Sequence, residues 1–226
     1  MTLSLVAADP ATGEVGVAIA SSSPAVAARC AHVRAGVGAV ATQNVTDPRL
    51  GPALLDRLAA GEAPEDALAA LVAAQRPELI AFRQLTCAAP DGRTAIFSGA
   101  HALGVVGEHR GAAVVSAGNL LAAPDVPERA AEGFEAATGS LAARLVAGLA
   151  AGIAAGGEAG PVHSAGLLIA RDVAWPVTDL RVDWADADPV GELAALWARW
   201  EPELEGYVTR ALQPGDAPSF GVPGDE

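Results

Sequence analysis

The residue with the clearest chemical potential is Thr2, whose hydroxyl side chain directly follows the initiator methionine. Removal of Met1 gives Thr2 a free α-amine, whose ordinary pKa of roughly 7.7–8.0 suits a base near neutral pH. One residue then supplies both a nucleophile and its base, which is the arrangement of N-terminal nucleophiles that attack amide carbonyls. The alternative is that Thr2 is an ordinary β-branched residue at the start of a strand.

Hydroxyl and amide side chains stand at the ends of three further predicted strands. These residues are Ser21 and Ser22, Gln43 and Asn44, and Asn119. Such groups beside the nucleophile would hydrogen-bond it, hold a substrate or stabilise an oxyanion. Their alternative roles are a polar strand exit, a turn amide or a helix cap.

Arginine supplies every strongly basic side chain, because the sequence contains no lysine. Arg34 opens the third predicted strand, where a guanidinium would lower the pKa of the Thr2 amine or hold a substrate carboxylate, although it cannot accept a proton. The alternative for Arg34 is a surface charge. Asp179, Arg181 and Asp183 alternate along a later strand and therefore share a face, which favours a structural ion-pair ladder.

The two cysteines, Cys30 and Cys87, lack the spacing of a metal or redox motif, and we interpret them as reduced thiols. A Cys30–His32 nucleophile pair is the alternative, but no third residue is placed to orient it. The other histidines show no ligand spacing, and no glycine-rich phosphate loop precedes a helix. We therefore expect neither a metal nor a cofactor.

The composition bounds the class of protein. The 226 residues are 51% hydrophobic, enough for one sizeable core. A formal net charge of −13 disfavours nucleic acid and anionic membranes as partners, because both bind basic faces. The N-terminus lacks the pattern of a secretion signal, and the apolar stretch 141–155 is too short to span a membrane. We therefore expect a cytoplasmic protein that acts on a small molecule.

Hydrophobic periodicity and turn signals predict the elements that position these residues. The predicted strands cover 2–8, 14–21, 37–43, 82–88, 93–98, 111–117, 164–171 and 180–184, and the predicted helices cover 48–60, 64–74, 125–137, 140–155 and 189–207. A short connection is expected over 24–32, and Asp125 and Ser140 are expected to cap helices.

Strands and helices cluster in separate runs, which is typical of the α+β class. Helices that arrive in pairs suit a four-layer αββα sandwich of two mainly antiparallel sheets. We expect one domain over residues 1–210, followed by a loosely ordered tail over 211–226 that is rich in acidic residues, proline and glycine.

Six segments together resemble a known family. They are TLSLVAADPATGEVGVAIAS (2–21), RAGVGAVATQ (34–43), AGEAPEDALAALVAA (60–74), RQLTCAAPDGRTAIFSG (83–99), GNLLA (118–122) and DLRVDWADADPVGEL (179–193). In order and spacing they resemble the Ntn-hydrolase-like family catalogued as domain of unknown function 1028, over residues 2–205. The resemblance implies the same αββα sandwich but no settled reaction. Proteasome-like relatives have an aspartate and an arginine after the second strand, where this chain has serines.

Two functional hypotheses follow from the sequence. The first is an N-terminal-threonine amidohydrolase that acts on a small amide, with Thr2 and Arg34 as catalytic residues and Ser21, Ser22, Gln43, Asn44 and Asn119 as contacts to substrate. The second is a non-catalytic scaffold of the same fold that binds a small ligand or serves as an assembly subunit. Trp197 and Trp200 on one side of the last predicted helix are expected to bury in the core or in a homodimer interface.

Overall fold

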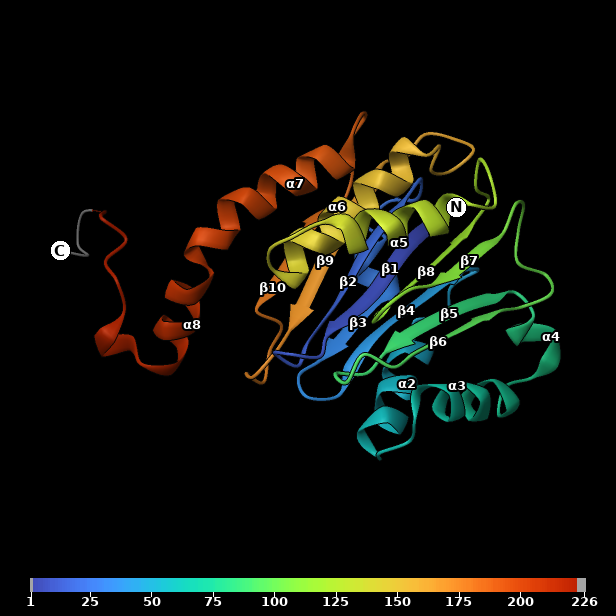
Figure 1. Cartoon of the computed structure of the whole chain (residues 1–226), viewed down its shortest axis with the longest axis horizontal. Helices are drawn as coiled ribbons and strands as arrows, with labels where there is room; N and C mark the ends of the chain where they lie inside the picture. The colour runs from blue at the N-terminus through green and yellow to red at the C-terminus, as the bar shows by residue number, and fades with distance from the viewer. Residues whose placement is uncertain (1, 223–226) are drawn as a thin grey trace.

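The computed structural model describes residues 2–222 and has two antiparallel sheets packed face to face (Figure 1). The larger sheet has the order β10 (Thr178–Val182), β9 (Ser164–Ala170), β2 (Glu14–Ser21), β1 (Thr2–Asp9), β8 (Val114–Asn119) and β7 (Gly107–Arg110). The smaller sheet has the order β3 (Ala31–Arg34), β4 (Gly38–Asn44), β5 (Arg83–Ala88) and β6 (Thr94–Ser98).

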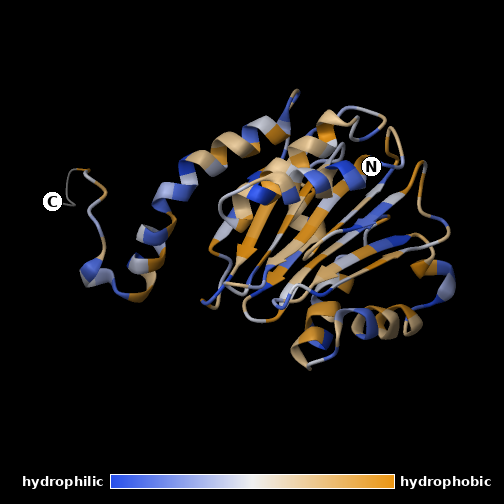
Figure 2. Ribbon diagram, viewed as in Figure 1, coloured by the Kyte–Doolittle hydropathy of each residue, from blue (hydrophilic) through white to orange (hydrophobic). Residues whose placement is uncertain are grey.

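Helices cover both outer faces, so the two sheets lie between two helical layers, as the sequence predicts (Figure 1). The larger sheet is covered by α5 (Val126–Ala136), α6 (Leu141–Ala154) and α7 (Pro189–Trp200), and the smaller one by α2 (Leu50–Ala59) and α3 (Pro64–Ala73). The short helices are α1 (Ala27–Cys30) and α4 (Pro77–Ile80). The apolar stripes of the helices face the sheets, whose strands are predominantly hydrophobic (Figure 2).

The central hairpin is buried on both sides. Side chains of β1 alternate, so that Leu3 and Leu5 pack against α5 and α6 while Val6 packs in the layer between the sheets. The turn that joins β1 to β2 is closed by Asp9, whose carboxylate accepts the Ala11 N–H at 3.0 Å. These two strands lie where sequence periodicity predicts them.

A close approach between α5 and α6 requires a glycine at position 148. A Cβ there would lie 2.7 Å from Leu5 Cδ2 and 2.8 Å from the Ala130 carbonyl oxygen. We expect Gly148→Val to lower the free energy of unfolding by about 1–3 kcal/mol, because overpacking forces the helices apart. Urea denaturation measures this change. Ala150→Val, at an exposed position of the same helix, is the control, and equal urea midpoints for the two variants would contradict the packing argument.

Several elements differ from those predicted. Residues 34–43 form a hairpin turn followed by β4, so Arg34 ends β3 instead of opening a longer strand. The strand β7 was not predicted, because its four residues are mostly exposed and carry no apolar alternation. Ser140 caps α6 as expected, accepting the Ala143 N–H. Asp125 accepts no capping hydrogen bond, because it is already helical and its carboxylate faces Arg129.

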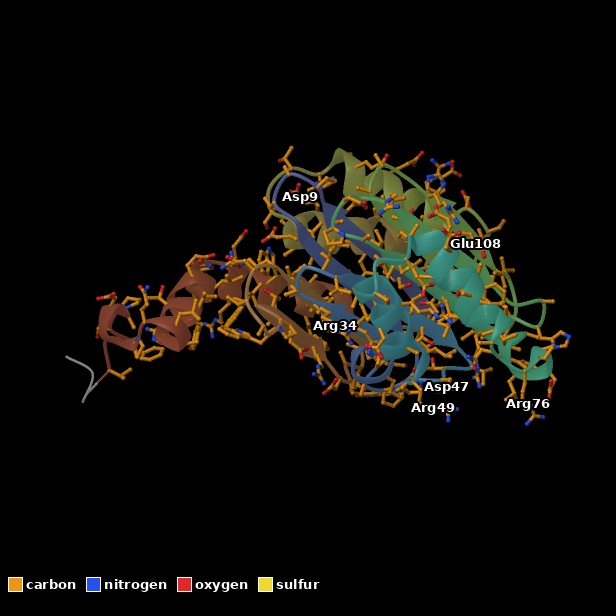
Figure 3. All side chains as sticks on the ribbon, turned by 90° about the horizontal axis from the view of Figure 1, so that it is seen from below. Asp9, Arg34, Asp47, Arg49, Arg76 and Glu108 are labelled. Carbon is orange, nitrogen blue, oxygen red and sulfur yellow. The ribbon has the colours of Figure 1, made fainter. Side chains whose placement is uncertain are left out.

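The predicted last helix, 189–207, is interrupted after Trp200. A 3₁₀ turn over Glu201–Glu203 contains Pro202, which lacks the N–H that a continuous helix needs, and α8 (Leu204–Leu212) follows. Trp197 is buried in the core, and Trp200 is half-buried. The α8 segment extends away from the sandwich in both views (Figures 1 and 3).

The predicted loose tail, 211–226, begins inside α8, and part of it packs on that helix. Arg210 lies over the Phe220 ring, 3.4 Å from its centroid, and residues 223–226 lie outside the described residues. The longest helix within residues 2–222 is α6, with 14 residues, and no helix there has the length and apolar character needed to cross a membrane.

Candidate functional site

A row of polar side chains crosses the larger sheet at one level. Asn119 of β8 lies opposite Thr2 in the β1–β8 register, and Ser164 of β9 lies opposite Ser21 of β2. Thr2 and Ser21 are neighbours across β1 and β2, with their hydroxyl oxygens 3.5 Å apart. Because paired residues of antiparallel strands share a face, all four side chains enter the layer between the sheets. Each is buried, and Thr2 is 5% exposed.

A second polar row faces the first from the smaller sheet. Gln43, Gln84 and Ser98 are paired across β4, β5 and β6. The Gln84 Oε1 atom accepts from Gln43 Nε2 at 2.6 Å and from Asn119 Nδ2 at 3.2 Å, so Gln84 joins the two sheets. Gln43 and Gln84 are at most 1% exposed. We call the two rows together the polar layer.

Backbone carbonyl groups fix the orientation of these amides. Gln43 Nε2 also donates to the Ala117 carbonyl oxygen, and Gln84 Nε2 donates to that of Gly118, both at 3.1 Å. A carbonyl oxygen can only accept, so Gln84 must turn its NH2 group toward Gly118 and its oxygen toward Asn119. The remaining oxygens, Gln43 Oε1 and Asn119 Oδ1, have no hydrogen-bond partner among residues 2–222. Buried acceptors without partners are costly, so this site is built to receive N–H or O–H donors.

The polarity is confined to one end of the layer between the sheets. Along that face β1 reads Thr2, Ser4, Val6 and Ala8, so the polar residues come first and the apolar ones follow. The apolar end is closed by residues of both sheets, including Val17. The polar layer therefore lies where the first strand begins.

Two residues, Ser23 and Arg29, continue the polar layer from Ser21 to the surface. The Ser21 and Ser23 hydroxyl oxygens lie 2.9 Å apart, and Arg29 Nη2 donates to Ser23 Oγ at 3.0 Å. Arg29 also donates to the Pro24 and Ala25 carbonyl oxygens. Arg29 is thus the arginine that is linked to Thr2 through serine hydroxyls. It was not predicted, because the sequence indicates only a short connection over 24–32 and does not show that this connection folds back beside Ser23.

A buried carboxylate lies beside the start of β1. Both oxygens of Glu158 accept the Ser22 N–H, at 3.2 and 3.1 Å, and the Glu158 backbone bridges Leu121. Glu158 therefore spans the ends of β2 and β8, the two neighbours of β1. Burial raises the pKa of Glu158 to about 7, against the opposing effect of the Ser22 N–H. The glycines around Glu158 in the sequence predict only a loop, so periodicity did not reveal this residue.

Two predicted site residues lie apart from the polar layer. Arg34 pairs with Gly38 in register, at the opposite end of β4 from Gln43, and its guanidinium contacts Asp56 at 2.8 Å on the surface (Figure 3). The expected role of Arg34 beside Thr2 is therefore wrong. Asn44 has a φ of +71° and links loops, donating to the Phe82 carbonyl oxygen and accepting the Leu103 N–H. Asn44 thus has the alternative role of a turn amide.

Burial disfavours the reactive thiolate form of both cysteines. The Cys30 thiol contacts the Thr46 hydroxyl at 3.4 Å, and burial raises the pKa of both Cys30 and Cys87, the latter to about 12. Burial also lowers the pKa of His32. Within residues 2–222, no three histidine, cysteine, aspartate or glutamate side chains gather closely enough to hold a metal ion.

Comparison with known proteins places the chain among proteins without an assigned reaction. A family model described as "Family of unknown function (DUF1028)" matches residues 2–193. The crystal structure of protein SPO2555 from Silicibacter pomeroyi, also described as DUF1028, is similar, with 28% identity, a TM-score of 0.81 and 88% of each chain covered. No curated protein matches the chain.

Proposed function

This chain belongs to the DUF1028 family, and we propose that it is an N-terminal-threonine amidohydrolase that cleaves an amide C–N bond of a small molecule. One observation carries the proposal: Thr2 lies between Asn119 and Ser21 in a buried polar row, and the polar layer around it holds two amide oxygens without donors among residues 2–222. The two-sheet sandwich with a hydroxyl residue opening its first central strand supports an Ntn-hydrolase-like fold. Function from a fold alone is analogy, so the proposal rests on the polar layer.

In the proposed reaction, Met1 is removed and the Thr2 α-amine becomes the base. The amine takes the hydroxyl proton while Thr2 Oγ1 bonds to the amide carbonyl carbon, and it then gives that proton to the departing nitrogen. Water hydrolyses the resulting ester and returns the threonine. The bond that breaks is the amide C–N bond, and no redox partner is needed.

The surrounding residues have complementary roles in this proposal. Asn119 and Gln43 present oxygens because their amide nitrogens donate to Gln84 Oε1, so these oxygens would accept N–H bonds from the amine or the substrate. Ser21, supported by Ser23 and Arg29, orients the Thr2 hydroxyl. Ser22 holds Glu158 through its backbone.

A non-catalytic role in small-ligand binding is the second candidate, and the two buried acceptors without donors among residues 2–222 favour it. The same acceptors, Gln43 Oε1 and Asn119 Oδ1, would then hold a ligand that carries N–H or O–H donors. This candidate needs no removal of Met1, so the state of the N-terminus separates the two functions.

Mass spectrometry of the intact protein and of its labelled peptides tests the proposal. We expect protein from its native host to lack Met1, and a small β-lactone to acylate the Thr2 peptide. Thr2→Ala should remove the label, whereas Ser4→Ala, at the next position on the same face of β1, should keep it. A retained Met1 in protein from the native host would exclude the mechanism as written.

A further inference from the structure

The outer edge of the larger sheet at β10 has no partner strand. Within residues 2–222, β10 pairs only with β9 and ends the sheet. An open edge presents unpaired N–H and C=O groups, which another strand can pair with. We propose that this edge pairs with the same edge of a second copy of this chain, which joins the two larger sheets around a twofold axis.

Exposed apolar side chains border this edge on both sides. A cavity of about 550 Å³ runs beside Trp184 and Leu196, and another of about 370 Å³ runs beside Trp175 and Tyr207. The exposed fractions of these four side chains range from 38% for Trp175 to 53% for Trp184. Grouped exposed aromatic residues are typical of protein interfaces.

The sequence of β10 is complementary to itself in one antiparallel register. If Leu180 lies opposite Leu180 of the second copy, Asp179 lies opposite Arg181 of that copy, and Arg181 opposite its Asp179. Both charged side chains are exposed and point to one face, where Arg181 donates to both Asp179 oxygens of its own chain at 2.8 and 2.7 Å, as the predicted ion-pair ladder requires. In the dimer each carboxylate would accept from an arginine of either chain. This register forms two opposite-charge pairs between the chains. Such self-complementarity is the property of a twofold interface, so we infer that the partner strand is β10 of a second copy of this chain.

Neighbouring registers are unfavourable. Centring the axis on Asp179 or on Arg181 places like charges directly opposite each other, which is destabilising. Shifting the pairing between the two β10 strands by one residue turns one sheet over. The helix-covered face of one copy would then be continuous with the inner face of the other copy. Of the axes at Asp179, Leu180 and Arg181, only the one at Leu180 keeps opposite charges paired, and it leaves both α7 helices on one side of the joined sheet.

Charge reversal tests this register. We expect the wild type to elute with twice the 22.5 kDa mass of one chain in size exclusion with light scattering. Asp179→Arg and Arg181→Asp each put like charges opposite, so each should weaken the dimer about tenfold or more. Mixing the two variants restores both opposite-charge pairs between chains and should recover a heterodimer. A monomeric wild type, or two variants that remain dimers, would overturn the proposal.

A crosslink tests the axis independently of charge. Leu180→Cys places two thiols opposite each other across the axis, within the reach of a disulfide, and mild oxidation should give a dimer on a non-reducing gel. Asp183→Cys is the matched control, because that exposed position lies several residues from the axis. The native Cys30 and Cys87 are buried, so we expect little disulfide crosslinking through them. Equal crosslinking of the two variants would exclude this register.

Discussion

Thr2→Ala is expected to reduce amide hydrolysis by about 10³-fold or more, because it removes the nucleophile that the proposed reaction requires. Thr2→Ser is expected to keep measurable turnover, since it retains a hydroxyl and an α-amine at the same place. Alanine and serine at position 2 are both small, so both variants should still lose Met1. Release of aminocoumarin from a panel of acyl-aminocoumarin amides measures the effect, with intact mass confirming the N-terminus of each variant.

The matched control for Thr2 is Ser4→Ala. Ser4 is fully buried on the same face of β1, and its hydroxyl has no hydrogen-bond partner in residues 2–222, so its removal should leave turnover unchanged. Equal rates for wild type and Thr2→Ala would reject catalysis by Thr2. Equal losses in Thr2→Ala and Ser4→Ala would assign the effect to packing of the polar layer instead of to the nucleophile.

The parts of the fold that follow from local pattern were predictable. The strands β1 and β2 are apolar on both faces, and the turn chemistry between them is strong, so their place in the centre of a covered sheet could be predicted from residues 2–21 alone. Three of the residues predicted at strand ends, Ser21, Gln43 and Asn119, lie in the polar layer, because the ends of their strands come together there.

The remainder of the site depends on register, which a single sequence does not specify. Arg34 was expected near Thr2 because it opens the third predicted strand, but the turn after Arg34 reverses the chain and leaves Arg34 at the opposite end of β4 from Gln43. Gln84 joins the two sheets only because β5 places it opposite Gln43 and within hydrogen-bond distance of Asn119. Glu158 lies in a glycine-rich loop, and only the contact with Ser22 brings its carboxylate to the site.

Glu158 should make the stability of the protein depend on pH. Burial raises the pKa of its carboxyl to about 7 in the folded state, whereas the unfolded chain has the ordinary value of 4.5. Below pH 4.5 both states hold the proton, and the contribution of Glu158 to stability is fully present. As the pH rises toward 7, the unfolded state gives up its proton first, so stability falls. Above pH 7 the unfolding free energy has lost the whole contribution of the Glu158 carboxyl, which is roughly 3 kcal/mol.

Glu158→Gln is expected to remove this dependence. The glutamine is neutral at every pH and keeps an oxygen that accepts the Ser22 N–H, so the variant should match the wild type near pH 4.5 and exceed its unfolding free energy at pH 8 by up to about 3 kcal/mol. Urea denaturation at intervals from pH 4.5 to 8 measures the difference. The lowered pKa of His32 acts in the opposite direction in this range, but it is common to both proteins and cancels in the comparison.

An exposed carboxylate provides the control for Glu158. Glu108 lies on β7 at the surface (Figure 3), so Glu108→Gln should follow the wild-type curve at every pH. If the Glu158→Gln curve also ran parallel to wild type, the carboxyl of Glu158 would be ionised normally in the folded protein, and burial beside Ser22 would not hold its proton. If the curves converge only in acid, the Glu158 carboxyl beside the start of β1 keeps its proton up to about pH 7, and its protonated fraction is available there as a hydrogen-bond donor.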